Sequence, residues 1–241
     1  MSRFFIEDIG APGATVAVEG DDAVHIRNVL RLKAGDRVTL CDGGGREGEA
    51  VIRSFGPNKA ILELIGVREN AAEPKHSVTL YQCLPKAGKM ELVIQKCVEL
   101  GIAAIAPVQS ARCVVKLEQK DVAKKIERYR RIALEAAKQS QRGAIPKVNE
   151  PVPIGKIDPG MHDLMIVAYE EETFPLKEVL RANKDALDIG LLIGPEGGLE
   201  RSEVDRLVSL GAKTASLGKR ILRTETAGMA TLAMILYELE G

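Results

Sequence analysis

The most constraining feature of this sequence is a short apolar run that ends in a cluster of glycines. Residues 189–193 read Ile-Gly-Leu-Leu-Ile, which is typical of a buried β-strand, and residues 194–198 read Gly-Pro-Glu-Gly-Gly. A helix-like segment follows. Glycines at the end of a buried strand leave peptide N–H and C=O groups without side-chain cover, which suits main-chain hydrogen bonds to an adenosine moiety. The alternative is a strand-to-helix turn whose glycines only supply positive φ.

A second glycine-bearing loop lies closer to the C-terminus. Leu217 and Gly218 end another short apolar segment, and Thr224 or Thr226 is placed to cap the last helix, whose N-terminus would favour a polar ligand. The standard nucleotide fingerprints are absent, because no Gly-x-Gly-x-x-Gly follows an early strand and Lys213 replaces the first glycine of a P-loop. The sequence therefore disfavours a Rossmann dehydrogenase and a P-loop ATPase.

Strands and helices alternate over residues 73–241. The predicted strands cover residues 77–84, 103–108, 164–169, 189–194 and 214–218, and the predicted helices cover residues 89–101, 121–143, 202–211 and 226–240. Within the second of these helices, Val122, Ile126, Tyr129, Ala133 and Ala136 recur at helical spacing. The alternation predicts an α/β sheet domain.

Residues 1–72 instead show short alternating stretches separated by turn residues. Strands are predicted over 37–42, 49–55 and 59–67, with a glycine-rich hairpin at 42–45 that needs no ligand to explain it. A short helix is predicted from residue 25, with Ile26, Val29 and Leu30 on one face and Gly35 just past its end. The polar, proline-containing stretch 69–77 marks a domain boundary near residue 72.

Charge is distributed unevenly, although the whole chain has a net charge of zero. Residues 112–147 contain 11 lysines or arginines and 4 acidic residues, a net charge of +7. Residues 148–210 contain 6 basic and 13 acidic residues, a net charge of −7. The basic segment predicts contact with nucleic-acid phosphate, and the alternative is a solvated helix face.

Several classes of protein are disfavoured. Acidic residues interrupt the N-terminus, and no apolar run approaches the roughly 18 residues of a spanning helix, so we expect a cytoplasmic protein without a membrane partner. The four cysteines form no Cys-x-x-Cys pair and only three histidines exist, so we expect reduced core thiols and no metal site or disulfide framework.

Several motifs together identify a family resemblance. The two C-terminal motifs are IGPEGGLE with Glu203 after it and LGKRILRTETA, and the others are RFF from Arg3, HIRNVLR over 25–31, KMELVIQKCVELG, SARCVVK and QSQR over 139–142. Over nearly its whole length the sequence resembles the 16S ribosomal RNA (uridine-N3) methyltransferases of the SPOUT class.

The resemblance implies both a fold and an activity. It implies an RNA-binding, PUA-like β-barrel over residues 1–72, a SPOUT methyltransferase domain with a C-terminal trefoil knot over residues 73–241, and a homodimer. The implied reaction is S-adenosyl-L-methionine-dependent methylation of N3 of a uridine in 16S rRNA of the small ribosomal subunit. The implied cofactor-binding residues are Ala168, Tyr169, Ile193, Gly194, Pro195, Glu196, Gly197, Gly198, Leu217, Gly218, Ile221, Leu222, Arg223, Thr226 and Ala227.

Four residues are candidates for catalysis. Methyl transfer from a sulfonium is an in-line displacement that needs no metal, so the protein must align donor and acceptor. Loss of the N3 proton spreads negative charge onto O2 and O4 of uracil, and an arginine there would stabilise it. Arg223 is the first candidate, followed by Arg3 and Arg142. Glu225 is a candidate general base, or alternatively a helix-start charge.

Two positions depart from the family's pattern. Glu200 stands where a helix-capping serine is common, which weakens the expected cap, and Lys138 replaces an acidic residue before Gln139.

Two other functions stay open. One is ribose 2′-O methylation by a related SPOUT protein, and the other is a non-enzymatic RNA-binding or assembly module whose glycine loops only make turns.

Overall fold

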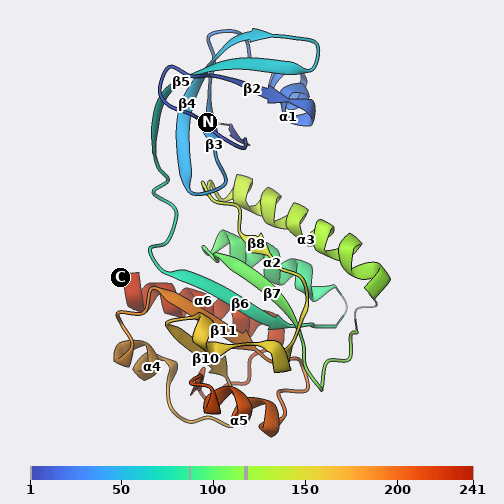
Figure 1. Cartoon of the computed structure of the whole chain (residues 1–241), viewed down its shortest axis with the longest axis vertical. Helices are drawn as coiled ribbons and strands as arrows, with labels where there is room; N and C mark the ends of the chain where they lie inside the picture. The colour runs from blue at the N-terminus through green and yellow to red at the C-terminus, as the bar shows by residue number, and fades with distance from the viewer. Residues whose placement is uncertain (1, 87, 117–118, 241) are drawn as a thin grey trace. The chain divides into compact units, whose positions relative to one another are not determined.

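The computed structural model describes residues 2–86, 88–116 and 119–240 and divides into two compact units (Figure 1). The first unit contains Met1–Glu73 and Ala137–Ile145, and the second contains Pro74–Ala136 and Pro146–Gly241. The sequence had predicted that residues 137–145 belong to the second domain, whereas in the structure they belong to the first unit. Leu117 and Glu118 of the basic segment lie outside the described residues.

The first unit is a curled five-stranded sheet around its own core. Its strands are β1 (Arg3–Phe5), β2 (Thr15–Glu19), β3 (Arg37–Cys41), β4 (Arg46–Phe55) and β5 (Lys59–Glu69), in the order β1-β3-β4-β5-β2. Only the β1–β3 pair is parallel. The three predicted strands are confirmed, because their alternating apolar side chains face one buried cluster. Register shifts in the β4–β5 pair are of the kind that bends strands.

The predicted hairpin turn at residues 42–45 is confirmed. Gly43 and Gly45 have φ of 72° and 111°, which an ordinary side chain would rarely adopt. The Asp42 carboxylate accepts hydrogen bonds from the backbone N–H groups of Gly44 (2.8 Å) and Arg46 (3.0 Å). Local backbone geometry therefore explains these glycines without a ligand.

The helix predicted from residue 25 begins earlier and changes type. α1 (Gly20–Val24) continues into a π-helical turn, η1 (His25–Val29), in which Leu30 N–H donates to His25 C=O at 2.9 Å. Ile26 is buried as predicted, but the prediction for Val29 was wrong, since its side chain is 64% exposed. The wider π-helical turn moves Val29 away from the face that an α-helical period would give it.

One carboxylate fastens residues 137–145 to the rest of the first unit. Glu73 accepts a hydrogen bond from Arg142 Nη2 (2.7 Å) and others from the backbone N–H groups of Gly143 (2.9 Å) and Ala144 (3.0 Å). Arg142 is only 3% exposed. Lys138, one of the two departures from the family's pattern, pairs with Asp22 at 3.2 Å. This segment is therefore an integral part of the first unit.

The second unit is built on a parallel sheet. Its strands are β6 (Ser77–Cys83), β7 (Ala104–Gln109), β8 (Lys147–Val148), β9 (Val152–Pro153), β10 (Leu164–Ala168), β11 (Asp188–Ile193) and β12 (Lys213–Ala215). The order is β12-β10-β11-β6-β7-β8, with β9 also pairing with β7, and all of these pairs are parallel. The predicted α/β sheet is confirmed, and the short strands β8 and β9 were not predicted.

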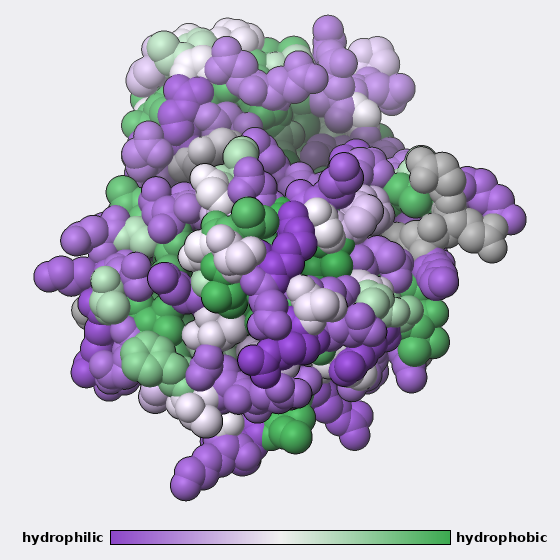
Figure 2. All heavy atoms as spheres, turned by 60° about the horizontal axis from the view of Figure 1, so that its bottom comes forward, coloured by the Kyte–Doolittle hydropathy of each residue, from purple (hydrophilic) through white to green (hydrophobic). Residues whose placement is uncertain are grey.

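Among the residues that the structure describes, five α-helices accompany this sheet. They are α2 (Lys89–Glu99), α3 (Gln119–Gln139), α4 (Leu176–Ala182), α5 (Arg201–Ser209) and α6 (Thr224–Glu240). α2 and α4 pack against α6, and α4 was not predicted. On α3, the predicted apolar positions Ile126, Tyr129, Ala133 and Ala136 are buried, whereas Val122 is half-buried. The face of this unit around α5 is mostly hydrophilic, with hydrophobic residues in separate small groups (Figure 2).

All four cysteines are buried and free. Within residues 2–86, 88–116 and 119–240, no helix is both long and apolar enough to cross a membrane. The same described ranges contain no group of three or more His, Cys, Asp or Glu side chains that would hold a metal ion.

Candidate functional site

A cavity of about 1010 Å³ lies in the second unit, where β10, β11 and β12 end. In open parallel sheets, ligands bind at this carboxyl edge because loops and helix N-termini converge there. Fourteen of the fifteen residues that the sequence analysis gave for cofactor binding line the cavity, whereas Thr226 is exposed and does not line it. The structure therefore brings the two glycine loops together around one space.

Other lining residues were not identified from the sequence. They are Lys89, Glu170, Glu172, Thr173, Pro175, Ser216, Lys219, Arg220 and Thr224, the last of which was considered only as a helix cap. Most belong to segments that directly follow β10 or β12. The rule that ligands bind where parallel strands end would have pointed to these segments, but not to Lys89 at the start of α2.

The first glycine loop directly continues the buried end of β11. Gly198 has φ of 71°, and its N–H donates to Pro195 C=O at 2.9 Å, so a tight turn requires glycine there. A Cβ on Gly198 would collide with the Glu170 carboxylate. Gly197 differs, because a Cβ there would make only an ordinary contact, 3.5 Å from Arg112 Cβ. At Gly197, therefore, bare main chain lines the cavity, although the fold itself does not require a glycine at this position.

Neighbouring segments fix the same loop from outside the cavity. Arg112 Nη1 donates to Gly197 C=O at 3.1 Å, and the Glu196 carboxylate accepts the backbone N–H of Lys86 at 2.9 Å. The Glu203 carboxylate accepts N–H groups from both Glu200 and Ala111, each at 2.9 Å. Glu200 and Glu203 therefore form a reciprocal capping box at the start of α5, and the prediction that Glu200 weakens this cap was wrong.

The second glycine loop leads into α6. Gly218 has φ of 105°, and its N–H donates to Ser216 Oγ at 3.3 Å. Thr224 was expected to cap this helix, but it is the first residue of α6 and is buried. Its hydroxyl donates instead to Gly194 C=O at 2.6 Å. The prediction that Thr224 or Thr226 caps this helix was wrong. Both threonines lie inside α6, where Thr226 N–H donates to Arg223 C=O at 2.8 Å, and Thr224 turns inward and joins the two glycine loops.

Glu225 forms an ion pair with Lys89, with 3.0 Å between Oε1 and Nζ. A hydrogen bond from its own backbone N–H and the Lys89 ammonium together lower the pKa of the Glu225 carboxyl. A general base works best when its pKa lies near the working pH, so a carboxylate held ionised in this way is a weak proton acceptor. This geometry favours the alternative in which Glu225 is a charge at the start of a helix.

The arginine candidates occupy different environments. Arg223 is exposed and lines the cavity, and no ion pair of the described residues involves it. Arg3 and Arg142 lie in the first unit and are mostly buried, with side chains 11% and 4% exposed. Each is held by a carboxylate at 2.7 Å, Glu47 for Arg3 and Glu73 for Arg142. Of the three, Arg223 alone presents an uncommitted guanidinium to the cavity among the residues described.

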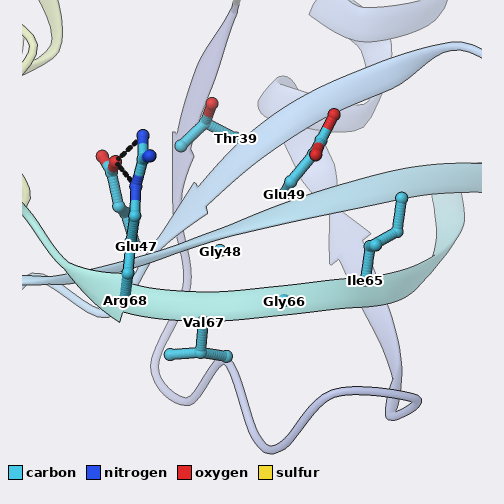
Figure 3. Close-up of a pocket in the computed structure, with 8 residues that line it drawn as sticks. All are labelled: Thr39, Glu47, Gly48, Glu49, Ile65, Gly66, Val67 and Arg68. Carbon is cyan, nitrogen blue, oxygen red and sulfur yellow. Dashed lines mark hydrogen bonds and ion pairs between the residues drawn. The ribbon is translucent and has the colours of Figure 1, made fainter.

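A smaller cavity of about 350 Å³ lies on the sheet of the first unit (Figure 3). Gly48 and Gly66 lie along it, and Arg68 pairs with Glu47 at one end. Burial opposes ionisation of Glu47, but hydrogen bonds from Arg3, Arg68 and Asn70 prevail and lower its pKa. The carboxylate therefore neutralises the cations beside it, and this cavity lacks the uncommitted positive charge that a polyanion would need.

Two family models match the chain. An RNA methyltransferase domain matches residues 72–236, and an RNA methyltransferase PUA domain matches residues 18–65. The first match covers the cavity and the strands that border it.

Similar proteins have been named and their structures solved. The ribosomal RNA small subunit methyltransferase E of Bacillus subtilis is 36% identical, and the match covers 100% of this chain and 98% of that protein. The structure of a protein of the same name from Neisseria gonorrhoeae, bound to S-adenosyl methionine, has 30% identity and a TM-score of 0.85 over 98% of this chain and 96% of that one. A putative methyltransferase from Legionella pneumophila, with bound cofactor SAM, has 29% identity and a TM-score of 0.82 over 97% and 96% of the two chains.

Proposed function

Because this chain belongs to the ribosomal RNA small subunit methyltransferase E family, we propose that the cavity at the ends of β10, β11 and β12 binds S-adenosylmethionine for methyl transfer to rRNA. The chain is an S-adenosylmethionine-dependent rRNA methyltransferase with a PUA-like N-terminal region. The observation that supports the site is the pair of glycine loops, which leave main chain bare around one cavity.

The cavity fits the chemistry of this cofactor. Its volume of about 1010 Å³ is ample for a nucleoside carrying an amino-acid chain. Bare peptide groups at residues 194–198 and 217–218 suit the hydrogen-bonding edge of an adenine, which carries no charge. When bound, the cofactor supplies a methyl group on a positively charged sulfur. The protein's own task is to hold that methyl group in line with the acceptor nitrogen.

The proposed acceptor is N3 of a uridine in 16S rRNA. Removal of the N3 proton places negative charge on the uracil oxygens, and a guanidinium that is free of other partners stabilises it best. Arg223 fulfils this condition, since no ion pair of the residues described involves it. Arg3 and Arg142, which are committed to carboxylates, serve the stability of the first unit in this proposal.

Further parts of the proposal follow from the family resemblance. The cavity loops form the C-terminal trefoil knot of a SPOUT domain in the second unit, and the PUA-like barrel in the first unit binds RNA. An rRNA substrate suits a cytoplasmic protein. Thr224 would stabilise this arrangement of the loops, because its hydrogen bond to Gly194 C=O holds the second glycine loop against the first.

The activity is tested by mass spectrometry of small-subunit rRNA nucleosides after incubation with the protein and S-adenosylmethionine. We expect 3-methyluridine to appear only when both are present. A ribose 2′-O-methylated nucleoside would assign the related reaction instead. Absence of any methylated product, together with absence of cofactor binding in calorimetry, would favour the non-enzymatic RNA-binding module.

The basic helix α3 is expected to contact RNA phosphates. Lys124 and Lys125 lie on it, and no ion pair of the described residues involves either. Neutralising one phosphate changes the slope of log affinity against log salt by roughly 0.7 to 0.9. Lys124→Ala combined with Lys125→Ala should therefore flatten this slope by roughly 1.4 to 1.8, and it should weaken binding of many RNA sequences alike.

A matched control separates this effect from net charge. Lys177→Ala combined with Lys184→Ala removes the same charge from exposed positions in the acidic segment 148–210. We expect this control to keep the wild-type slope when affinities are measured across a salt series. Identical slopes for wild type and both double variants would show that α3 presents only a solvated face.

We also propose a homodimer in which a second copy covers the outer face of α6. The inner face of this helix is buried within its own unit, but Met234 and Tyr237 remain 42% and 82% exposed. Large apolar side chains exposed together on one helix mark interaction surfaces. Light scattering at micromolar concentration is expected to give twice the monomer mass of 26.0 kDa.

Tyr237→Glu should shift this protein toward the monomer, because a charge buried in an apolar interface is unfavourable. Met161→Glu is the control, since Met161 is 71% exposed but lies away from α6 in a separate 3₁₀ turn, η3 (Pro159–Met161). A monomeric mass for the wild-type protein would contradict the proposed dimer.

A further inference from the structure

A fully buried glutamine lies directly behind the cavity. Gln82, near the end of β6, is 0% exposed, and its Nε2 donates to Thr224 Oγ1 at 2.9 Å and to Cys83 C=O at 3.1 Å. Thr224 Oγ1 in turn donates to Gly194 C=O at 2.6 Å. Three segments that are distant in sequence are therefore joined by one chain of hydrogen bonds.

The direction of each hydrogen bond between Gln82, Thr224 and Gly194 follows from the donors and acceptors available. Two acceptors, the Thr224 hydroxyl oxygen and the Cys83 carbonyl, lie within reach of Nε2, which fixes the orientation of the amide. Because a hydroxyl has a single proton, Thr224 accepts from Gln82 and directs that proton to Gly194 C=O. Gln82 therefore determines where the Thr224 proton points.

The same glutamine carries an uncompensated polar atom. Its Oε1 is buried and has no hydrogen-bond partner among the described residues. The backbone of Gly228 on α6 closes over it, since a Cβ on Gly228 would lie 3.1 Å from Oε1. A buried acceptor without a partner destabilises a fold, so an apolar side chain of similar size would serve packing better. The two hydrogen bonds from Nε2 are what the glutamine contributes here and an apolar side chain would not.

We propose that Gln82 is a positioning residue for the cofactor site. Through Thr224 it holds Gly194 of the first loop and the start of α6, where Arg223 and Ala227 line the cavity. Gln82 itself does not line the cavity. Its effect on the ligand is indirect, and the inference rests on the proposed binding of S-adenosylmethionine there.

The test is Gln82→Leu, which removes both the donor and the unpaired acceptor at similar volume. We expect calorimetry to show about tenfold weaker binding of both S-adenosylmethionine and S-adenosylhomocysteine. The melting temperature should change little, since removal of the unpaired Oε1 offsets the loss of the two hydrogen bonds that Nε2 donates. In turnover assays the KM for the cofactor should rise about tenfold, with kcat changed less than threefold, because the hydrogen bonds that are lost hold Thr224 and Gly194 and do not involve the Arg223 guanidinium.

Two further variants sharpen the test. Thr224→Val removes the hydroxyl that joins Gln82 to Gly194, and so it breaks the same hydrogen bonds. The double variant Gln82→Leu with Thr224→Val should bind the cofactor no more weakly than Thr224→Val alone, because both substitutions act through the Thr224 hydroxyl. Thr231→Val is the matched control. Thr231 is also fully buried on α6, but its hydroxyl donates only to Ala227 C=O in its own helix, at 2.7 Å. This variant should keep the wild-type cofactor affinity.

The outcomes distinguish this inference from the proposed function. Failure of the wild-type protein to bind the cofactor would overturn both. Wild-type binding together with unchanged affinity in Gln82→Leu and Thr224→Val would overturn the positioning role alone. A loss of affinity accompanied by a large fall in melting temperature would also overturn it, because Gln82 would then be only a core residue.

Discussion

Gly197→Val is expected to abolish measurable binding of S-adenosylmethionine while leaving the protein folded. A Cβ at this position makes ordinary contacts with Arg112, the nearest at 3.5 Å from its Cβ, and the residue does not have positive φ. The two valine methyl groups would instead press on the Arg112 side chain, which holds this loop through its hydrogen bond to Gly197 C=O at 3.1 Å, and would displace the loop that lines the cavity. Loss of the hydrogen bond that holds this loop, together with displacement of the peptide groups that line the cavity, should weaken binding at least about 100-fold.

Calorimetry with the cofactor and a thermal melt of the same sample measure both effects. Gly155→Val is the matched control, because Gly155 lies in the 3₁₀ turn η2 (Ile154–Lys156), outside the cavity, with open space around its Cβ position. Gly198 is less informative, since its φ of 71° makes any substitution strained. Unchanged cofactor affinity in folded Gly197→Val protein would show that this loop does not hold the ligand.

Arg223→Ala is expected to lower kcat about 100- to 1000-fold, the usual effect of removing one group that stabilises developing negative charge. Arg223 is exposed, lines the cavity and has no ion pair among the described residues, so its removal leaves no carboxylate unpaired. Folding and cofactor affinity should therefore change much less than kcat. The difference in kcat between wild type and Arg223→Ala should become smaller as pH rises, because more of the uridine then loses its N3 proton without help from Arg223.

Single-turnover rates across a pH series, at saturating RNA and cofactor, measure this effect. Arg223→Lys should fall between wild type and Arg223→Ala, since it keeps the charge but loses the planar fork of donors. Arg201→Ala is the control, because Arg201 is exposed on α5 and already pairs with Asp205. A wild-type rate for Arg223→Ala, with a large loss for Glu225→Gln, would transfer the catalytic role to Glu225.

Local patterns in the sequence predicted the long elements of the fold. An apolar strand or an amphipathic helix carries its own periodicity, so the strands of the parallel sheet and the buried face of α3 were identified correctly. The two-residue strands β8 and β9 are too short to carry a period. Val29 was misplaced because the periodicity argument assumes an α-helix, whereas this turn is π-helical.

The site was predicted in part, for a related reason. Glycine next to a buried strand is a local signal, and it led to both loops that border the cavity. Lys89 has no such signal, because its position beside Glu225 arises only from packing of α2 against α6. The partners of Arg3 and Arg142 lie 44 and 69 residues away in sequence, so nothing near either arginine indicated that its charge is already compensated.

The carboxylate of Glu73 has a consequence for how the chain is made. Strands β1–β5 leave the ribosome early, but the residues that complete their unit, up to Ile145, are synthesised only after a large part of the second unit. During that interval Glu73 lacks Arg142 and the N–H groups of Gly143 and Ala144. The first unit therefore reaches its final structure only after more than half of the chain has been translated, and a fragment that ends near residue 72 would lack the segment that completes this unit.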